Sequence, residues 1–222
     1  MRAEVGLLTR NVKITAALDG EPCTGYDLDT CKLLADDGED GLYGGHTIAF
    51  EGFKSYNIRG AELRFMGQTQ IISRYPIHFH MAKDTRRDGK PPVIEGNSIR
   101  DSLSRCITVH GSHYVEIKNN VANNHWGHCI FLEDGGEKHT LIEGNLVLGT
   151  KKGELIQTDC QPTSYWITSP LTIVRNNVAA GAHEWDGNGF WWLFPDEPIG
   201  LSTGLGFYEN REAKRTPITE IS

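Results

Sequence analysis

The segment Ile94-Glu95-Gly96-Asn97-Ser98-Ile99 recurs three times further along the chain. The copies are Ile117-Lys118-Asn119-Asn120-Val121, Ile142-Glu143-Gly144-Asn145-Leu146-Val147 and Val174-Arg175-Asn176-Asn177-Val178. Their aligned asparagines, Asn97, Asn120, Asn145 and Asn177, are separated by 23, 25 and 32 residues. A period near two dozen residues, built from short strands without helical spacing, is typical of the coils of a parallel β-helix. The repeat predicts an all-β fold, a right-handed parallel β-helix.

The repeated asparagine has a structural interpretation. At a tight bend between two strands, asparagine tolerates the left-handed region of φ, and stacked side-chain amides hydrogen-bond from one coil to the next. We therefore interpret Asn97 and its equivalents as a ladder that stabilises the fold, and not as catalytic groups.

A second strand follows the first in several coils. Residues 75–80, 105–110 and 128–133 align when Ile77, Ile107 and Ile130 are superposed. Because alternate residues of a strand share a face, we expect a stacked core from these isoleucines and the residues two positions later, Phe79, Val109 and Leu132. The same register predicts two outward columns, which are His78, Thr108 and Phe131, and then His80, His110 and Glu133.

Length and composition indicate one folded domain. The 222 residues include 38% hydrophobic and 23% charged side chains, and the 25 glycines suit many turns between short strands. We expect lead-in coils over residues 1–50 with a polar loop at 20–43, regular coils over 51–200 and a tail at 201–222.

The net charge of the chain limits the classes of molecule that it is expected to bind. A formal net charge of −7 argues against nucleic acid, which is bound through a surplus of lysine and arginine. An anionic polysaccharide would need a local basic groove or a bridging cation. We find no secretory apolar run after Met1 and no stretch long enough to span a membrane.

The five cysteines lack the close pairing of a zinc site. Cys23 and Cys31 flank a short polar loop and are candidates for a disulfide. We interpret the other three, Cys106, Cys129 and Cys160, as small buried hydrophobic residues.

The outward column is the candidate site. His80, His110, Glu133 and the adjacent Asp134 fall on successive coils, whose spacing of about 4.8 Å places neighbouring side chains within reach of one another. These four are the candidate catalytic residues. The candidate substrate contacts are Arg74, His78, Arg105 and His128. The alternative is an ordinary solvated face, on which a histidine beside a glutamate forms an ion pair of little energetic value.

Two chemistries fit this set of residues. Glycoside hydrolysis needs a proton-donating carboxylic acid and a second carboxylate, for which Glu133 and Asp134 are candidates, with Asp101 and Asp159 in reserve. Polysaccharide β-elimination needs a base such as histidine and a cation that neutralises the uronate. The sequence does not separate them, and adjacent residues such as Glu133 and Asp134 would face opposite sides unless the chain turns at Gly135-Gly136.

Two further features have structural explanations. The aromatic cluster of Trp185, Phe190, Trp191, Trp192 and Phe194 is suited to stacking on sugars, but we favour a cap on the last coil. The acidic run at residues 36–40 offers carboxylates for Ca²⁺, but its spacing does not match an EF-hand, and we favour a solvated loop.

Several long motifs resemble one family. They are residues 1–11, Gly44-Gly45-His46, Met66-Gly67-Gln68, residues 75–80, 104–111 and 127–135, and Thr158-Asp159-Cys160. They occur in the order found in the β-helix region that follows the G8 domain in the cell migration-inducing hyaluronan-binding protein and transmembrane hyaluronidase family. Fibrocystin-like proteins share much of this pattern, and the resemblance extends from residue 1 to about residue 200.

The resemblance implies an extracellular or cell-surface, hyaluronan-directed endo-glycosidase, with a glycosaminoglycan as its partner and Ca²⁺ as a possible cofactor. It also implies neighbouring domains, because in the family a glycine-rich domain precedes this segment and further β-helix follows it. The fibrocystin-like relatives imply the alternative of a binding or structural β-helix without catalysis, and a polysaccharide lyase is a third option.

Overall fold

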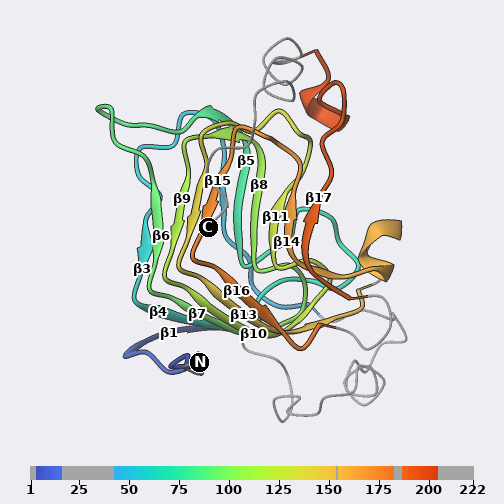
Figure 1. The fold of residues 1–222 in the computed structure, drawn as a ribbon. Coiled ribbons are helices and arrows are strands. Elements are labelled where there is room, and N and C mark those ends of the chain that lie inside the picture. Colours follow the sequence, from blue (N-terminus) through green and yellow to red (C-terminus); the bar gives the residue numbers. More distant parts are fainter. Residues whose placement is uncertain (1–3, 17–42, 154, 183–186, 205–222) are drawn as a thin grey trace.

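The computed structural model describes residues 4–16, 43–153, 155–182 and 187–204. These residues form the predicted right-handed parallel β-helix, in which three sheets of parallel strands enclose the core (Figure 1). Sheet 1 contains β1 (Val12–Thr15), β4 (Ala61–Arg64), β7 (Ser98–Ser102), β10 (Val121–Trp126), β13 (Leu146–Lys151) and β16 (Val178–Ala180). Sheet 2 contains β2 (Ile48–Ala49), β5 (Ile77–Asp84), β8 (Ile107–His113), β11 (Ile130–Leu132), β14 (Thr163–Ile167) and β17 (Asn188–Trp192). Sheet 3 contains β3 (Ile58–Arg59), β6 (Val93–Glu95), β9 (Glu116–Lys118), β12 (Leu141–Glu143) and β15 (Ile173–Arg175).

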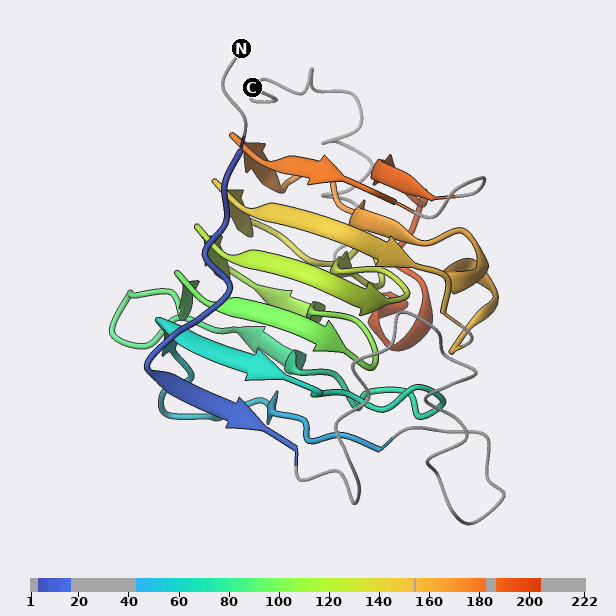
Figure 2. The same ribbon diagram turned by 90° about the horizontal axis from the view of Figure 1, so that it is seen from below.

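The coils stack in chain order, as Figure 2 shows. The N-terminal segment before β1 runs along the stack and crosses several coils on its way. It is held there by hydrogen bonds from Ser98 Oγ to Leu8 O, at 2.7 Å, and from Arg10 Nε to Gly96 O, at 2.8 Å. Residues far apart in the sequence therefore share one edge of the solenoid.

The predicted asparagine ladder is confirmed. The side-chain oxygens of Asn120, Asn145 and Asn177 each accept hydrogen bonds from the backbone N–H and the side-chain amide of the preceding ladder asparagine, at 2.9–3.0 Å. The prediction that the ladder asparagines themselves adopt the left-handed region of φ was wrong by one position. The residues with positive φ are those just before the ladder, Gly96, Asn119, Gly144 and Asn176. Glycine and asparagine there make the bend, and the ladder residue makes the hydrogen bonds.

The predicted register of sheet 2 is also confirmed. Ile107 pairs with Ile77 in β5 and with Ile130 in β11, and all three are buried in the core. Phe79, Val109 and Leu132 form the next layer of the same core. Sheet 1 begins directly after each ladder asparagine, but the sequence pattern did not delimit its strands.

The last coil shows how the core is closed. Trp192 and Phe194 are partly buried and pack against the core, as expected of a cap. Phe190 stacks on Tyr165 with ring centroids 4.5 Å apart, and Trp191 lies parallel to Trp166. Trp185 lies outside the described residues.

The predictions for the cysteines need correction. Cys106 and Cys129 are buried in the core, as expected, but they form a disulfide that joins two adjacent coils. Cys160 is exposed and is a free thiol, contrary to our expectation. Cys23, Cys31 and the acidic run at residues 36–40 lie outside the described residues, as does most of the polar loop at 20–43.

Candidate functional site

The imidazoles of the candidate site meet at the middle of β5 and β8. His78 and His80 point to the same side of β5, and His80 pairs with His110 across the sheet. Their facing Nδ1 atoms are 3.2 Å apart. The register of β5 shifts immediately after His80, where Met81 adopts a φ of 49°. Such a bulge re-aims the strand next to the site.

The two carboxylates converge on His110. Strand β11 ends at Leu132, and the chain turns, so that Glu133 and Asp134 do not face opposite sides as regular strand residues would. His110 Nε2 donates to Asp134 Oδ2 at 2.7 Å, and His110 Nδ1 lies 3.5 Å from Glu133 Oε2. The predicted column is therefore a compact cluster, which we call the histidine–carboxylate cluster: His78, His80, His110, Glu133 and Asp134.

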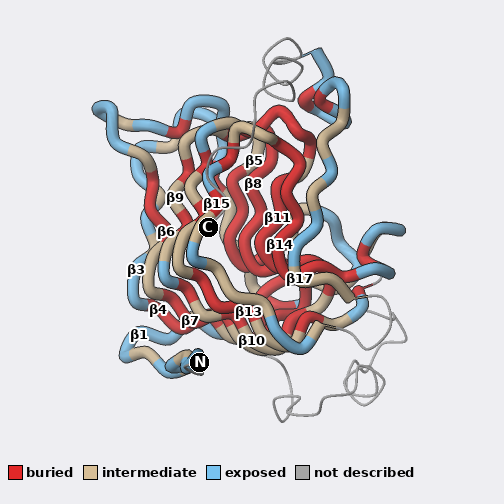
Figure 3. The backbone as a smooth tube through the Cα atoms, viewed as in Figure 1, coloured by how far each residue is buried: buried red, intermediate tan, exposed pale blue. Residues whose placement is uncertain are grey.

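The cluster is far less exposed than a surface column. His78 is 0% exposed, His110 5% and Asp134 4%, whereas the side chain of Glu133 keeps 24% of its surface. The strands β5, β8 and β11 are coloured as buried over much of their length in Figure 3. The segment after β17 covers part of it, since Ser202 N donates to Asp134 Oδ2 at 3.0 Å. The alternative of an ordinary solvated face does not fit this burial, to which the later segment contributes.

Arg105 is enclosed between two aromatic rings. Its guanidinium carbon lies 3.6 Å from the centroid of Phe131 and 5.0 Å from that of Tyr75. It also approaches Glu133 Oε2 at 4.0 Å and Asp159 Oδ1 at 3.7 Å. Since Arg105 is only 1% exposed, we correct its predicted role: it orders two carboxylates from within and is not open to substrate.

The remaining candidates are dispersed. His128 is fully buried, accepts the Thr163 N–H at 3.1 Å and lies 3.3 Å from Asp159, so it is not a surface contact either. Arg74 is half-buried, with its Nη1 3.4 Å from His46 Nε2. Asp101 lies on sheet 1, where it pairs with Arg64 and Arg100.

The environment shifts several pKa values. Burial lowers the pKa of His78 to about 3, and burial together with the nearby His110 lowers that of His80. Burial also disfavours protonated His110, but the hydrogen bond to Asp134 and the charge of Glu133 outweigh it and raise the pKa of His110. Burial raises the pKa of Glu133 against the opposing charges of His110 and Arg105. The cluster thus combines imidazoles at His78 and His80 that favour the neutral form with a more basic His110, and Glu133 holds its proton more tightly than usual.

Sequence reasoning missed Glu137. This fully buried carboxylate accepts hydrogen bonds from the backbone N–H groups of Gly111, Asp134 and Gly135, at 2.9, 3.2 and 2.8 Å. It fixes the turn that presents Glu133 and Asp134 to His110. An acidic residue directly after Gly135-Gly136 was the available signal, because glycine backbones leave N–H groups open to a nearby acceptor.

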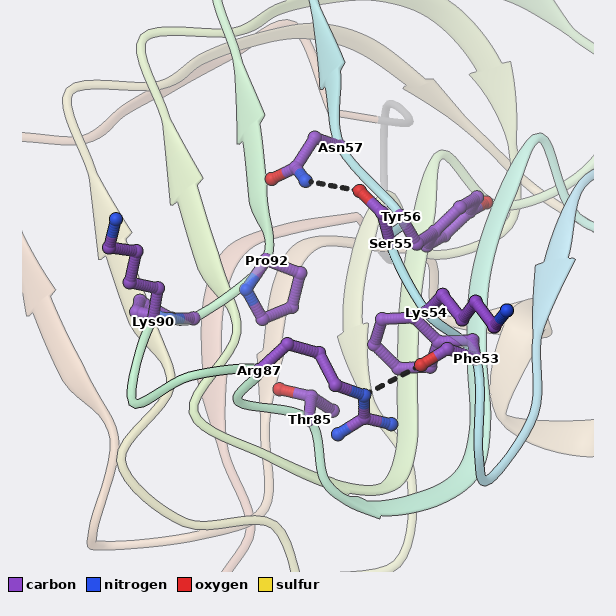
Figure 4. Close-up of a pocket in the computed structure, with 10 residues that line it drawn as sticks. Phe53, Lys54, Ser55, Tyr56, Asn57, Thr85, Arg87, Lys90 and Pro92 are labelled. Atoms are coloured by element: carbon purple, nitrogen blue, oxygen red, sulfur yellow. Dashed lines mark hydrogen bonds between the residues drawn. The ribbon is translucent and has the colours of Figure 1, made fainter.

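A separate pocket lies beyond the C-terminal end of β5, which is Asp84. Residues 53–57, 85, 87 and 90–92 line it, and Figure 4 shows Lys54, Arg87 and Lys90 around it. Arg87 is held by Phe53, since its Nε donates to Phe53 O at 2.6 Å. The lining contains no carboxylate, so the pocket suits an anion but offers no acid for catalysis.

Fold and site together define a right-handed parallel β-helix that carries buried ionisable side chains on one sheet. The sequence model of the CEMIP beta-helix family matches residues 42–222, and the chain belongs to this family. It is 36% identical to the mouse (Mus musculus) protein named cell migration-inducing and hyaluronan-binding protein, over 92% of the chain. It is 37% identical over the same share to the human (Homo sapiens) protein named cell surface hyaluronidase CEMIP2.

The chain corresponds to a small part of these relatives. It spans 16% of the length of each of them, and 5% of mouse fibrocystin-L, to which it is 29% identical. In the part of the chain that the structure describes, no helix has the length and apolar character needed to cross a membrane.

Proposed function

We propose that this chain is the carbohydrate-directed β-helix module of a cell-surface or extracellular protein and that it acts on hyaluronan or a related glycosaminoglycan. Two relatives that match 92% and 98% of the chain are named cell surface hyaluronidases. The observation that carries the proposal is the partly exposed Glu133, which lies 3.5 Å from His110 Nδ1 in an otherwise buried cluster. The relatives extend well beyond the matched segment, and neighbouring domains are part of this proposal.

Glu133 is the proposed general acid. Hydrolysis of a glycosidic bond needs a carboxylic acid that still carries its proton near neutral pH, and burial raises the pKa of Glu133 in that direction. Asp134 is a positioning residue in this scheme, so the second carboxylate that hydrolysis needs would come from outside this cluster. The Asp134 carboxylate is occupied by His110 Nε2 and Ser202 N, so it holds His110 and does not itself face the polymer.

A lyase is the second candidate, and one observation favours it. His80 is only half-buried and has a lowered pKa, so it is available as a neutral base for proton abstraction. The two reactions differ in their products, since only elimination leaves an unsaturated uronate. A binding module without catalysis is the third candidate, and the buried hydrogen bonds of Asp134 favour it.

The test is incubation with size-defined hyaluronan, using the chain alone and joined to the flanking domains of a relative, with and without Ca²⁺. We expect shortening without new ultraviolet absorbance, and a loss of about 100-fold or more in Glu133→Gln. Glu143→Gln is the matched control, because Glu143 pairs with Arg175 on sheet 3 and is part of no cluster proposed for catalysis.

The outcomes separate the candidates. Shortening with new absorbance would replace the hydrolase by the lyase. If the chain binds hyaluronan saturably but does not shorten it, both alone and joined to the flanking domains, the binding module without catalysis is the remaining candidate. Equal activity of Glu133→Gln and Glu143→Gln would remove Glu133 from the reaction.

A further inference from the structure

His78 carries a buried nitrogen without a hydrogen-bond partner among the described residues. Its Nδ1 lies 3.1 Å from the carbonyl oxygen of Ser73, and a carbonyl only accepts, so Nδ1 holds the ring proton. The lone pair is therefore on Nε2, which is fully buried and unpartnered. A buried lone pair without a donor is costly, and each such atom in a native protein needs an explanation. His78, His80 and His110 each offer one ring nitrogen, and these three nitrogens lie within 4.8 Å of one another.

The distance between His80 and His110 supports one explanation. Their Nδ1 atoms are 3.2 Å apart. Two imidazole nitrogens bound to one Zn²⁺ at about 2.0–2.1 Å with tetrahedral angles are separated by roughly 3.3 Å. A hydrogen bond between the two rings would also give this distance, but it would leave His78 Nε2 without a partner.

The other side of His110 has the support that metal ligands usually have. His110 Nε2 donates to the buried carboxylate of Asp134 at 2.7 Å, so in the neutral ring the lone pair is on Nδ1, which faces His80. The carbonyl oxygen of Ser73 likewise accepts from His78 Nδ1, so the lone pair of that ring is on Nε2. A carboxylate or a carbonyl on the far nitrogen fixes the tautomer and orientation of metal-binding histidines. Two of the three rings are therefore already oriented with the correct nitrogen inward.

Ca²⁺, the ion implied by resemblance, does not fit this cluster. Ca²⁺ takes six to eight oxygen ligands, whereas three of the five donors here are imidazole nitrogens. Of the two carboxylates, Asp134 is already bound to His110 and Ser202. Imidazole donors suit Zn²⁺, Cu²⁺, Ni²⁺ and Fe²⁺.

We propose that His78 Nε2, His80 and His110 Nδ1 form a binding site for one divalent first-row transition metal ion, with Glu133 beside it at the partly exposed side. The ion would place positive charge next to Glu133, where it would oppose the burial that raises the pKa of this carboxyl. A chain of net charge −7 needs such a local charge if it is to receive an anionic polymer. Any role of the ion in shortening hyaluronan rests on the proposed function, whereas metal binding does not.

The experiment is calorimetric titration of the untagged chain, stripped with a chelator, with Zn²⁺. Cys160 is alkylated beforehand, because it is an exposed thiol that could bind zinc independently. We expect one equivalent to bind, and Ca²⁺ in large excess not to displace it. His80→Gln and His110→Gln should weaken the binding at least 100-fold, and Asp134→Asn by about 10- to 100-fold through the lost orientation of His110. His139→Asn is the matched control, because His139 is exposed and belongs to none of the potential metal-ligand groups among the described residues, and asparagine tolerates its positive φ.

A second measurement, the visible absorption of bound Co²⁺, needs no substituted chain. Co²⁺ in a four-coordinate, nitrogen-rich site absorbs visible light strongly, whereas Co²⁺ bound to surface oxygens absorbs weakly. Strong absorption by the chain without substitutions and with Cys160 alkylated, abolished by one equivalent of Zn²⁺, supports the site even if a variant fails to fold. Weak absorption only, or equal Zn²⁺ affinity in His80→Gln and His139→Asn, would overturn the proposal. A positive titration with no shortening of hyaluronan would leave the metal site standing and count against the proposed function alone.

Discussion

Removal of one amide from the middle of the asparagine ladder should destabilise the chain far more than removal of the last one. Asn120 donates from Nδ2 to Ile94 O at 2.9 Å and to Asn145 Oδ1 at 3.0 Å. Its Oδ1 accepts from the backbone N–H and from the side chain of Asn97, both at 3.0 Å. Asn120→Ala removes all four hydrogen bonds in a site that is 3% exposed.

The loss in the free energy of unfolding depends on which hydrogen-bonding groups keep a partner in Asn120→Ala. Asn97 Nδ2 still reaches Ile58 O, and Asn145 Oδ1 still accepts from the backbone of residue 120. The Asn97 N–H loses its acceptor, and Ile94 O loses a donor. At about 1–3 kcal/mol for each buried group left unsatisfied, the free energy of unfolding should fall by about 3 kcal/mol.

Asn177→Ala is the matched control. Asn177 also accepts two hydrogen bonds from Asn145, but it is half-buried in the last rung, so water can replace the lost amide. We expect a loss of about 1 kcal/mol there. Urea unfolding followed by tryptophan fluorescence measures both, provided that the slope against urea is unchanged. Equal losses in Asn120→Ala and Asn177→Ala would refute the reasoning, because they would show that burial does not set the cost.

Two further predictions concern stability. Burial lowers the pKa of His125 to about 3, below the ~6.5 of an unfolded chain, so the unfolded state binds the additional proton as the pH falls. Acidification from pH 7 to pH 5 should therefore cost about 2 kcal/mol through this residue, and urea titrations at both pH values should show that His125→Gln loses this share of the pH dependence. The Cys106–Cys129 disulfide spans 23 residues, so its removal in a Cys106→Ala/Cys129→Ala double variant should lower stability by about 3 kcal/mol. Thiol labelling of the chain unfolded in urea without a reductant should modify Cys160 and leave Cys106 and Cys129 unmodified, and labelling of either would contradict the disulfide.

The sequence predicted those features that repeat from coil to coil. The ladder asparagines and the register of Ile77, Ile107 and Ile130 recur at similar positions in successive coils, and stacking makes each copy support the others. A periodic signal of this kind also located His80 and His110 opposite each other. The pairing across β5 and β8 could therefore be predicted without any knowledge of the loops.

Features that depend on non-repeating segments could not be predicted. The burial of the cluster depends partly on Ser202, which is 68 residues from Asp134 in the sequence and has no counterpart in other coils. The environment of Arg105 likewise depends on Asp159, from the 3₁₀ helix Gln157–Cys160. A strand register specifies which side a residue points to, but it does not specify what lies over that side.

The difference between repeating strands and non-repeating loops explains how the histidine–carboxylate cluster stays intact while the coils differ in length. Thirty residues separate His80 from His110, more than the 23 between Asn97 and Asn120, and the excess includes the excursion at residues 85–92. That excursion begins after β5 has ended, so it changes the pocket of Figure 4 and leaves the pairing at His80 unaltered. An insertion within residues 77–80 would instead move every later side chain of the strand to the opposite face. Variation in the loops is thus compatible with a constant site, and the positions that must stay in register are those that bring His78 and His80 to His110.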